Sequence, residues 1–316
     1  MAKRKIDVII ISYNTRDYTL ECIRSVKLTT NDFTTGIIVV DNASSDDTIE
    51  AIHTEFPDVE IVINKKNLGY AAAINRGAEA SDAEYLILSN SDVVFHRNAI
   101  DLLVEYLESH PFAGTAGPQQ YYPDGSWQYS FNRFPGAILA VKDILFISAI
   151  ERKFHKLTNR FNIFKHPRRV DYTDGAVIAV RHSDFLEAGG FDESYFFYSE
   201  ETDFCRKMIE SGHKNAFLPK SKVTHHRGAS TGASIPHEKN IRMQIQSQIH
   251  FCDKWLSPAS AWFYITFDKY YYLILAWLLR LAYVFVGSDR RQNFRQKIMS
   301  LIKYFEIWKE AVKPDK

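Results

Sequence analysis

Cysteine is scarce in this chain, and no charge of one sign is in excess. Its 316 residues include only three cysteines, Cys22, Cys205 and Cys252, which lie far apart and form no CxxC pair. An odd and scattered set argues against a disulfide framework or a structural zinc site, and it fits a reducing compartment. The formal net charge is +1, whereas a nucleic-acid-binding protein would show a basic excess. We therefore expect no nucleic-acid partner.

The chain also lacks two common phosphate-binding signatures. No GxGxxG follows the first apolar run, and no GxxxxGK[ST] occurs anywhere, which disfavours a Rossmann dinucleotide site and a P-loop. The basic start is followed by an apolar run that ends at Ser12, which is too short for a secretory signal. We expect the protein to stay in the cytoplasm.

What the chain does have is an alternation of β-branched runs and helical patterns. Strands are expected at 6–11, 37–40, 59–63, 85–88 and 171–180, and helices at 70–80, at 200–211 and beyond 236. Such alternation predicts a parallel sheet with helices on both faces. The stretch 112–169 is less regular, and we expect a lid or an acceptor-side insertion there.

Polar side chains stand where three of these strands end. They are Ser12 and Asn14 after the first strand, Asp41 after the second, and Asn90 and Asp92 after the fourth. Ligands of open α/β sheets bind at the carboxyl ends of the strands. Such residues also form turns and helix caps, and we adopt that reading for residues 44–47. A carboxylate that ends a buried strand is costly without a partner, so Asp41 and Asp92 are candidates for function.

Seven motifs stand in a fixed order along the chain. They are residues 8–14, 39–44, 67–77, 86–92, 174–176, 189–206 and 225–230. In this order they resemble family 2 glycosyltransferases, inverting enzymes of the GT-A fold. The subgroup that the chain is most similar to includes rhamnosyltransferases of bacterial surface-polysaccharide assembly.

The resemblance implies a fold and a division of the chain. The fold is α/β of the GT-A type, a mainly parallel sheet flanked by helices, with a helical C-terminal appendage. Residues 1–235 would form the catalytic domain, with the nucleotide-sugar-binding half at 1–110 and the acceptor and catalytic half at 111–235. Residues 236–316 would form the helical C-terminal region.

Roles for the polar residues follow from the same resemblance. Asp41 matches the acid that hydrogen-bonds the donor base, with Ser12 and Asn14 nearby, and Asn67 and Asn75 match positions that line the nucleotide pocket. The triplet 90–92 matches the DxD element, so Asp92 would bind a divalent metal, Mg²⁺ or Mn²⁺, and Asn90 would face the ribose or a metal-bound water. His225 matches a further contact to the metal or the diphosphate.

The Tyr-x-Glu-Asp motif of the family reads Tyr198-Ser199-Glu200-Glu201 here. Its last residue is taken as the catalytic base, so Glu201 is the candidate, and Glu200 stays open as an alternative because glutamate reaches further than aspartate. The structural alternative is a solvated helix N-terminus, where acids are favoured by the helix dipole.

The resemblance implies transfer of a sugar from a dTDP- or UDP-sugar, dTDP-rhamnose among them, to an acceptor hydroxyl with inversion. The acceptor would be a saccharide or a lipid-linked saccharide. An inactive sugar-nucleotide-binding or scaffold protein of the same fold is the alternative. A nucleotidyltransferase would carry a glycine-rich basic loop after its first strand, and a processive synthase would carry Gln-x-x-Arg-Trp and several spans; neither pattern is present.

The C-terminal quarter is apolar and aromatic from 262 to 286, but Asp268, Lys269 and Arg280 interrupt the run. A spanning helix needs about 20 apolar residues, whereas aromatic and basic side chains together suit a bilayer interface. Residues 290–309 alternate basic and apolar side chains at helical spacing. We expect peripheral binding to an anionic membrane surface, at the inner face of the cell membrane. The alternatives are a membrane-spanning helix, packing on the catalytic domain and a homodimer contact.

Overall fold

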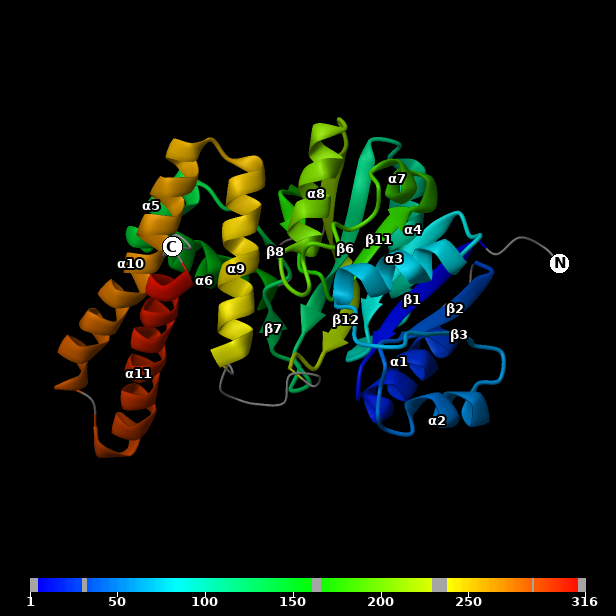
Figure 1. Ribbon diagram of the computed structural model, residues 1–316, viewed down its shortest axis with the longest axis horizontal. Helices are drawn as coiled ribbons and strands as arrows, with labels where there is room; N and C mark the ends of the chain where they lie inside the picture. Colours follow the sequence, from blue (N-terminus) through cyan, green and yellow to red (C-terminus); the bar gives the residue numbers. More distant parts are fainter. Residues whose placement is uncertain (1–4, 30–32, 161–165, 229–237, 286, 312–316) are drawn as a thin grey trace. The chain divides into compact units, whose positions relative to one another are not determined.

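The computed structural model describes residues 5–29, 33–160, 166–228, 238–285 and 287–311. The chain forms two compact units (Figure 1). The first holds residues up to 134 together with 155–234, and the second holds 135–154 together with 235–316. The second unit therefore includes a piece of the segment for which we expected a lid or acceptor-side insertion. The division at 235 into a catalytic domain and a C-terminal region stays a prediction.

A mixed sheet forms the centre of the first unit. Among the described residues its main path runs β3-β2-β1-β4-β11-β6-β12-β5. These strands are β1 (Ile6–Ser12), β2 (Thr35–Asp41), β3 (Glu60–Ile63), β4 (Tyr85–Asn90), β5 (Val93–Phe95), β6 (Ala113–Tyr121), β11 (Val177–Arg181) and β12 (Lys214–His225). Short strands β7 (Trp127–Gln128) and β9 (Arg168–Val170) pair with β6 and β12, while β8 (Phe131–Asn132) and β10 (Tyr172–Thr173) form a separate pair.

The four N-terminal strands of the path are parallel, as their β-branched sequences predict. Every residue of β1 is buried, which is typical of a parallel strand covered on both faces. Beyond β4 the sheet changes direction, because β11 runs antiparallel to both β4 and β6. The single strand predicted at 171–180 is wrong in detail, since the Asp-Gly turn at 174–175 separates β10 from β11.

Helices cover both faces of this sheet. Along β1, Ile6, Val8 and Ile10 enter one core cluster, whereas Ile9 and Ile11 enter the other; this is the two-residue alternation of a strand. The first cluster includes side chains from α1 (Arg16–Thr29), α2 (Thr48–Glu55) and α4 (Ala99–Ser109). The second includes side chains from α3 (Tyr70–Ala80), α7 (His182–Glu187) and α8 (Glu200–Glu210). The predicted α/β fold with flanking helices is confirmed.

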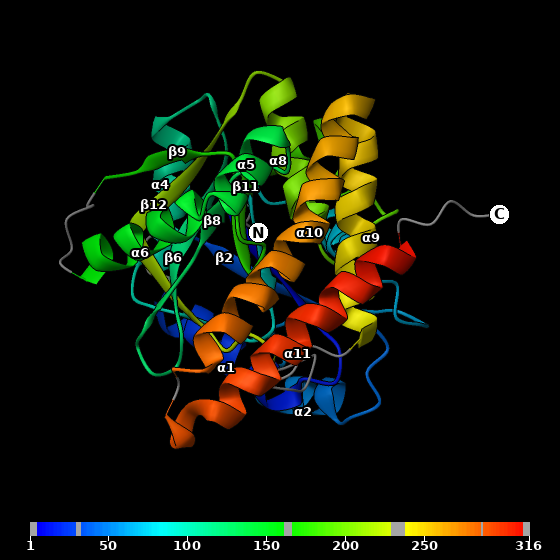
Figure 2. The same ribbon diagram turned by 90° about the vertical axis from the view of Figure 1, so that its left-hand side faces the viewer.

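The described part of the second unit is helical, as predicted for the region beyond 236. Its elements are α5 (Ala137–Ile144), the first half of α6 (Ile147–Arg160), α9 (Glu238–Trp255), α10 (Pro258–Tyr283) and α11 (Ser288–Ala311). Ser257 caps α10 by accepting a hydrogen bond from the amide of Ser260, and proline occupies the first turn, where its missing N–H costs nothing. Figure 2 shows α10 and α11 packed side by side. No helix among the described residues is both long and apolar enough to cross a bilayer.

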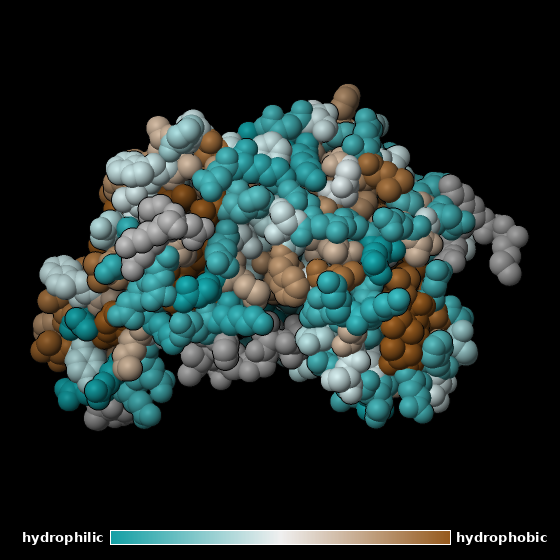
Figure 3. All heavy atoms as spheres, in the orientation of Figure 1, coloured by the Kyte–Doolittle hydropathy of each residue, from teal (hydrophilic) through white to brown (hydrophobic). Residues whose placement is uncertain are grey.

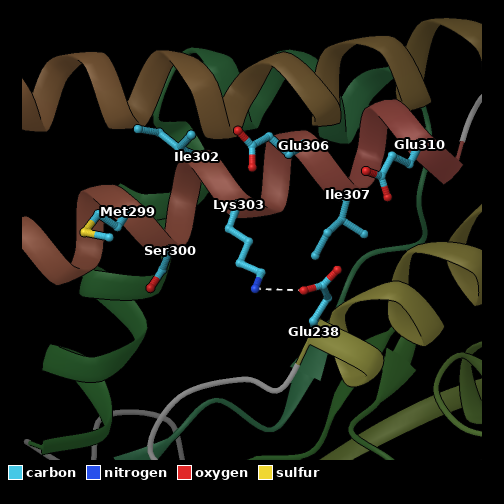
Figure 4. Close-up of a pocket in the computed structure, with 8 residues that line it drawn as sticks. All are labelled: Glu238, Met299, Ser300, Ile302, Lys303, Glu306, Ile307 and Glu310. Carbon is cyan, nitrogen blue, oxygen red and sulfur yellow. Dashed lines mark ion pairs between the residues drawn. The ribbon is translucent and has the colours of Figure 1, made fainter.

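A groove of about 530 Å³ lies within this second unit, between α9 and α11 (Figure 4). Its walls carry three glutamates, and Lys303 pairs with one of them, Glu238, at 2.8 Å. The remaining lining is Met299, Ser300, Ile302, Glu306, Ile307 and Glu310. This groove has neither the strand ends nor the ordered motifs of the first unit, and its lining comes from α9 and α11.

Candidate active site

Strand register brings the first polar residues together. Ser12 at the end of β1 pairs with Asp41 at the end of β2, and on the other side Ile11 pairs with Asn90 at the end of β4. The three polar side chains therefore lie at the same edge of the parallel sheet, where ligands of such sheets bind.

Asp41 is fully buried, and only one of its carboxylate oxygens has a partner among the described residues. Oδ2 accepts a hydrogen bond from the amide of Ser44 at 2.9 Å, whereas Oδ1 is buried without one. An unmatched buried acceptor costs about 1–3 kcal/mol. Oδ1 is therefore set to accept a hydrogen bond from a ligand.

Asn14 braces the same turn from the other side. Its side-chain oxygen accepts a hydrogen bond from the backbone amide of Ser45 at 2.7 Å. The backbone amide of Asn14 donates to Ser44 Oγ at 2.9 Å. Its backbone is left-handed, with φ of 53°, which asparagine tolerates better than most residues. Asn14 thus shapes the loop beside Asp41.

The hydroxyl of Ser12 belongs to a buried network. Its Oγ lies 2.9 Å from Thr19 Oγ1 and 3.2 Å from Thr15 Oγ1, and Thr15 continues the chain to Ser91 Oγ at 2.9 Å. This network ties the start of α1 to the turn between β4 and β5 that carries Asp92. Sequence reasoning missed Thr15 and Thr19, because isolated threonines in a helical pattern carry no signal of their own.

Asn67 and its neighbours form a hydrogen-bonded loop before α3. The buried side chain of Asn42 donates to Asn67 Oδ1 at 3.0 Å and to the carbonyl of Gly69 at 3.1 Å. Asn67 Oδ1 also accepts from the amide of Gly69 at 2.9 Å. The amide oxygen of Asn67 is therefore engaged within the loop, and Asn42 is the residue that organises it.

Asn75 lies on α3 and holds the loop at 189–193. Its Nδ2 donates to the carbonyl of Phe191 at 2.9 Å and to Glu193 Oε1 at 3.0 Å, while its Oδ1 accepts from the amide of Phe191 at 2.9 Å. A second tie joins α3 to this segment, because the amide of Tyr70 donates to the carbonyl of Phe196 at 2.8 Å. These bonds fix the stretch that leads into α8.

Asp92 and His225 form a buried pair, as a shared metal site requires. Asp92 Oδ1 lies 3.4 Å from His225 Nε2, and each residue is only 5% exposed. The antiparallel pairing of β5 with β12 places Val93 opposite His225, and the amide of His226 donates to the carbonyl of Asp92 at 3.0 Å. Two strands that are distant in the sequence thus bring the pair together.

The surroundings of His225 fit a metal ligand. Its Nδ1 lies 3.1 Å from both Gln120 Oε1 and Gln128 Oε1, so with these amide oxygens as acceptors Nδ1 carries the proton. The lone pair of Nε2 then faces a carboxylate oxygen, an arrangement that calls for a cation or a proton between them. Histidine ligands of metals characteristically donate their other N–H to an oxygen in this way. Gln120 and Gln128 were not predicted, since glutamine in an irregular stretch gives no signal.

The described residues supply few side chains that could coordinate a metal ion. Within the described ranges no three His, Cys, Asp or Glu side chains are grouped to hold a metal ion. Divalent cations of nucleotide sites are commonly held by one or two protein side chains, with phosphate oxygens and waters completing the shell. The Asp92–His225 pair fits that pattern.

Glu200 and Glu201 begin α8, after a turn in which Tyr198 and Ser199 have positive φ. Glu200 is buried, and its Oε2 has no hydrogen-bond partner among the described residues. Burial, and then repulsion from Glu201, raise the pKa of Glu200 well above its usual range. Glu200 therefore holds its proton more tightly than an exposed glutamate does.

Glu201 is partly exposed, and its side chain packs beside Gly175, where an added Cβ would approach its Cγ to 3.1 Å. Burial and the charge of Asp174 raise the pKa of Glu201 to about 7. A general base works best when its pKa is near the working pH. The pKa of Glu201 meets this requirement. Asp174, a residue that the sequence analysis quoted only within a motif, sets part of this shift.

Tyr70 contacts the turn against which Glu201 also packs. The hydroxyl of Tyr70 donates to the carbonyl of Gly175 at 3.3 Å, and the side chain of Glu201 lies beside the same Gly175. Burial, and then the charges of Glu200, Glu201, Asp92 and Asp174, raise the pKa of Tyr70 well above its usual range. The amide of Asn90 donates to the carbonyl of Ala176 at 3.0 Å, which joins the end of β4 to this turn.

Comparisons with known proteins identify the family of this chain. The family model described as glycosyl transferase family 2 matches residues 7–184. An N-acetylglucosaminyl-diphospho-decaprenol L-rhamnosyltransferase of Mycobacterium tuberculosis is 29% identical over 237 residues, which cover 71% of this chain and 77% of that protein. Rhamnosyltransferase WbbL of Escherichia coli is 24% identical over 226 residues, which cover 69% and 82%.

Solved structures share the fold. GalNAc-T7 with UDP, GalNAc and Mn²⁺ superposes with a TM-score of 0.60 at 16% identity, over 96% of this chain but 56% of that one. A mannosyltransferase from Pyrobaculum calidifontis, in complex with GDP-Man and Mn²⁺, superposes with a TM-score of 0.59 at 14% identity, over 98% and 87%. At these identities the likeness shows the fold alone, and it confirms the predicted GT-A type.

The family model covers more than half of the chain, and the similar curated proteins are rhamnosyltransferases. This chain belongs to glycosyl transferase family 2, and it is a glycosyltransferase.

Proposed function

We propose that this enzyme transfers a sugar, with inversion and with a divalent metal, from a dTDP- or UDP-sugar to an acceptor hydroxyl in cell-surface polysaccharide assembly. The observation that carries the proposal is the buried Asp92–His225 pair, 3.4 Å apart. Glu201 supports it, because its side chain packs beside Gly175, whose carbonyl accepts a hydrogen bond from the Tyr70 hydroxyl.

The donor base binds at the ends of β1 and β2 in this proposal. The partnerless Oδ1 of Asp41 accepts a hydrogen bond from the imide N–H that uracil and thymine share. Asn90 faces the ribose or a metal-bound water. Ser12, Asn14, Asn67 and Asn75 shape the pocket through the bonds described above, Asn75 by fixing the loop at 189–193.

Asp92 and His225 would hold the metal. A divalent cation, Mg²⁺ or Mn²⁺, would neutralise the charge that develops on the departing diphosphate, an effect of several kcal/mol. Gln120 and Gln128 support it by keeping the proton of His225 on Nδ1, so that Nε2 faces the ligand.

The base is Glu201. The acceptor oxygen forms a bond to the anomeric carbon while the bond from that carbon to the diphosphate oxygen breaks, and Glu201 takes the hydroxyl proton. A positioned general base typically contributes about a hundred- to ten-thousand-fold in rate. No covalent sugar–enzyme intermediate is needed, and attack from the face opposite the diphosphate gives inversion.

The names of the similar proteins suggest which substrates to test first. The Mycobacterium tuberculosis relative is named for L-rhamnosyl transfer to N-acetylglucosaminyl-diphospho-decaprenol. We therefore propose dTDP-rhamnose as the first donor to test, and a saccharide on a polyprenyl diphosphate as the acceptor class. Such an acceptor places the enzyme at the inner face of the cell membrane, bound peripherally through its C-terminal helices.

The test uses the full-length chain with Mn²⁺, a panel of dTDP- and UDP-sugars and a short-chain lipid-linked N-acetylglucosamine. One donor should give a disaccharide whose anomeric configuration, read by NMR, is opposite to that of the donor. Retained configuration would remove the single-displacement mechanism. Binding of nucleotide sugars without turnover of any donor would favour the scaffold alternative, for which the comparisons give no support.

A further inference from the structure

Exposed apolar side chains are concentrated in the second unit. That unit holds about a third of the chain, yet most of the large apolar side chains that are exposed among the described residues belong to it. They are Ile138, Val141, Leu145, Ile147, Ile150, Phe154, Trp262, Tyr270, Leu273, Ile274, Trp277, Leu281, Val284, Phe285 and Met299. Soluble surfaces carry such side chains singly, whereas a large exposed group marks an interaction surface.

Helix α10 holds six of these fifteen side chains. Its exposed side chains recur at helical spacing from Trp262 through Trp277 to Leu281, and Phe285 just beyond it is 90% exposed. In Figure 3 hydrophobic residues lie on the surface over the C-terminal end of α10, at the far left. This is the region for which the sequence predicts membrane binding.

Helix α5 also belongs to the second unit, although the sequence analysis assigned its residues to the acceptor and catalytic half. It packs against α10 within the second unit through Ala140, which shares a core cluster with Cys252, Ala261 and Tyr264. Its other side leaves Ile138, Val141 and Leu145 exposed by 77%, 43% and 59%. These positions follow the i, i+3, i+7 spacing of one helix face. One face of α5 thus makes the core of the unit, and the other offers apolar side chains to the surroundings.

The start of α6 repeats the pattern and adds charge. Ile147, Ile150 and Phe154 are exposed at the same i, i+3, i+7 spacing, and Arg152 and Lys153 between them are exposed as well. An apolar stripe with basic residues beside it is the composition of a helix that lies in a bilayer interface. Glu151 is paired with Lys142 at 2.6 Å. With Asp143 counted as well, α5 and the start of α6 hold three basic and two acidic side chains, a local net charge of +1.

We infer that α5 and the start of α6 bind an anionic lipid surface together with α10, so that the membrane-binding unit is built from two separate pieces of the chain. The basic side chains point to anionic headgroups as the partner, rather than to a second copy of this chain, whose matching face would repel. The inference rests on the membrane part of the proposed function. Its consequence is that removing residues 235–316 would leave a lipid-binding segment inside the remaining chain.

The test compares three full-length triple variants in flotation with phosphatidylcholine vesicles, with and without phosphatidylglycerol. The first is Ile138→Gln, Val141→Gln and Leu145→Gln on α5. The control is Leu28→Gln, Phe112→Gln and Leu186→Gln, whose side chains are 79%, 72% and 56% exposed in the first unit. The third is Trp277→Gln, Leu281→Gln and Phe285→Gln at α10. Glutamine keeps helix propensity, and circular dichroism with thermal melts checks folding.

The α5 variant should lose about tenfold or more in its partition coefficient onto the anionic vesicles, because three apolar side chains no longer leave water. The control should bind as the wild type does. If the α5 variant binds like the control while the α10 variant is impaired, α5 faces something other than lipid and the inference is wrong. A change from dimer to monomer in the α5 variant, with unchanged vesicle binding, would also overturn it in favour of a dimer contact.

Release of nucleoside diphosphate from the donor separates this inference from the proposed function. All three variants should keep the wild-type rate with a water-soluble acceptor, since none of their residues belongs to the candidate site. A wild type with no donor turnover would defeat the proposed function while the vesicle comparison still decides the role of α5.

Discussion

Replacing Glu201 by glutamine should separate activity from stability. The change keeps the size of the side chain and removes its charge. Because the carboxylate is the proposed base, kcat should fall by about a hundred- to ten-thousand-fold. The wild-type enzyme should show the titration of the same group, with kcat/KM falling tenfold per pH unit below the pKa of about 7, since the protonated acid cannot accept the acceptor proton.

The same variant should lose activity but gain stability at high pH. Burial and Asp174 raise the pKa of Glu201 from 4.5 to about 7, so the folded state holds its proton more tightly than the unfolded state does. The free energy of unfolding of the wild type therefore falls as pH rises from about 4.5 to about 7, because Glu201 ionises. Above pH 7 the whole of this loss is present. At about 1.4 kcal/mol per pKa unit, Glu201→Gln should be more stable than the wild type at pH 8 by at most about 3 kcal/mol, with little difference near pH 4.5.

Urea unfolding at pH 5 and pH 8, together with the pH profile of product formation, measures both effects. Glu79→Gln is the matched control, because Glu79 is an exposed glutamate of α3; it should change neither rate nor stability. A Glu201→Gln enzyme with the wild-type rate, or an acid limb near pH 4.5, would refute the assignment of the base.

Three further predictions concern the donor, the metal and the loop before α3. Asp41→Asn should raise the KM for the donor by about ten- to a hundredfold, because Asn can turn a donor group toward the imide N–H; equal donor KM values for variant and wild type would contradict the role of Asp41. His225→Ala should raise the Mn²⁺ concentration needed for half-maximal activity by at least about tenfold, measured by metal titration after chelation, and an unchanged titration would remove His225 as a ligand. Gly69→Ala should lower the free energy of unfolding by at least about 2 kcal/mol, because Gly69 has φ of 86° and an added Cβ would meet the carbonyl oxygen of Phe196 at 2.3 Å; Gly136→Ala, where a Cβ meets nothing within 4 Å, should be nearly neutral, and similar losses for both would contradict the packing argument.

The N-terminal half of the fold could be predicted because its strands carry their own signal. The run at 6–11 is nearly all β-branched, and β1, β2 and β4 occur where the sequence placed them. Strands β6 and β12 were missed. Residues 113–121 read AGTAGPQQY, with glycine, proline and glutamine in place of β-branched residues, and they form a strand only because β11 and β12 pair with both of its edges. Strand β12 contains a proline, which it accommodates at the register shift between Leu218 and Lys222.

The candidate site also contains residues with a local sequence signal and residues without one. Asp41, Asp92 and Glu201 could be chosen as candidates from the sequence because each belongs to a local motif, and their roles stay predictions. Asp174, Gln120 and Gln128 act through contacts across the fold, with Glu201 and His225, and such contacts leave no local pattern. For Asn75 the motif predicted a pocket-lining residue, whereas the structure shows an amide bound to the loop at 189–193; whether it also contacts the nucleotide stays a prediction.

The most direct test of the account is the release of nucleoside diphosphate from the preferred donor by Asp92→Asn. Asp82→Asn, an exposed aspartate before β4, is the control. The account predicts a Mn²⁺-dependent wild-type rate that chelation abolishes, a loss of at least about a hundredfold in Asp92→Asn, and a wild-type rate in Asp82→Asn. An Asp92→Asn enzyme that keeps its rate, or a wild type indifferent to chelation, would show that the Asp92–His225 pair is not the centre of this chemistry.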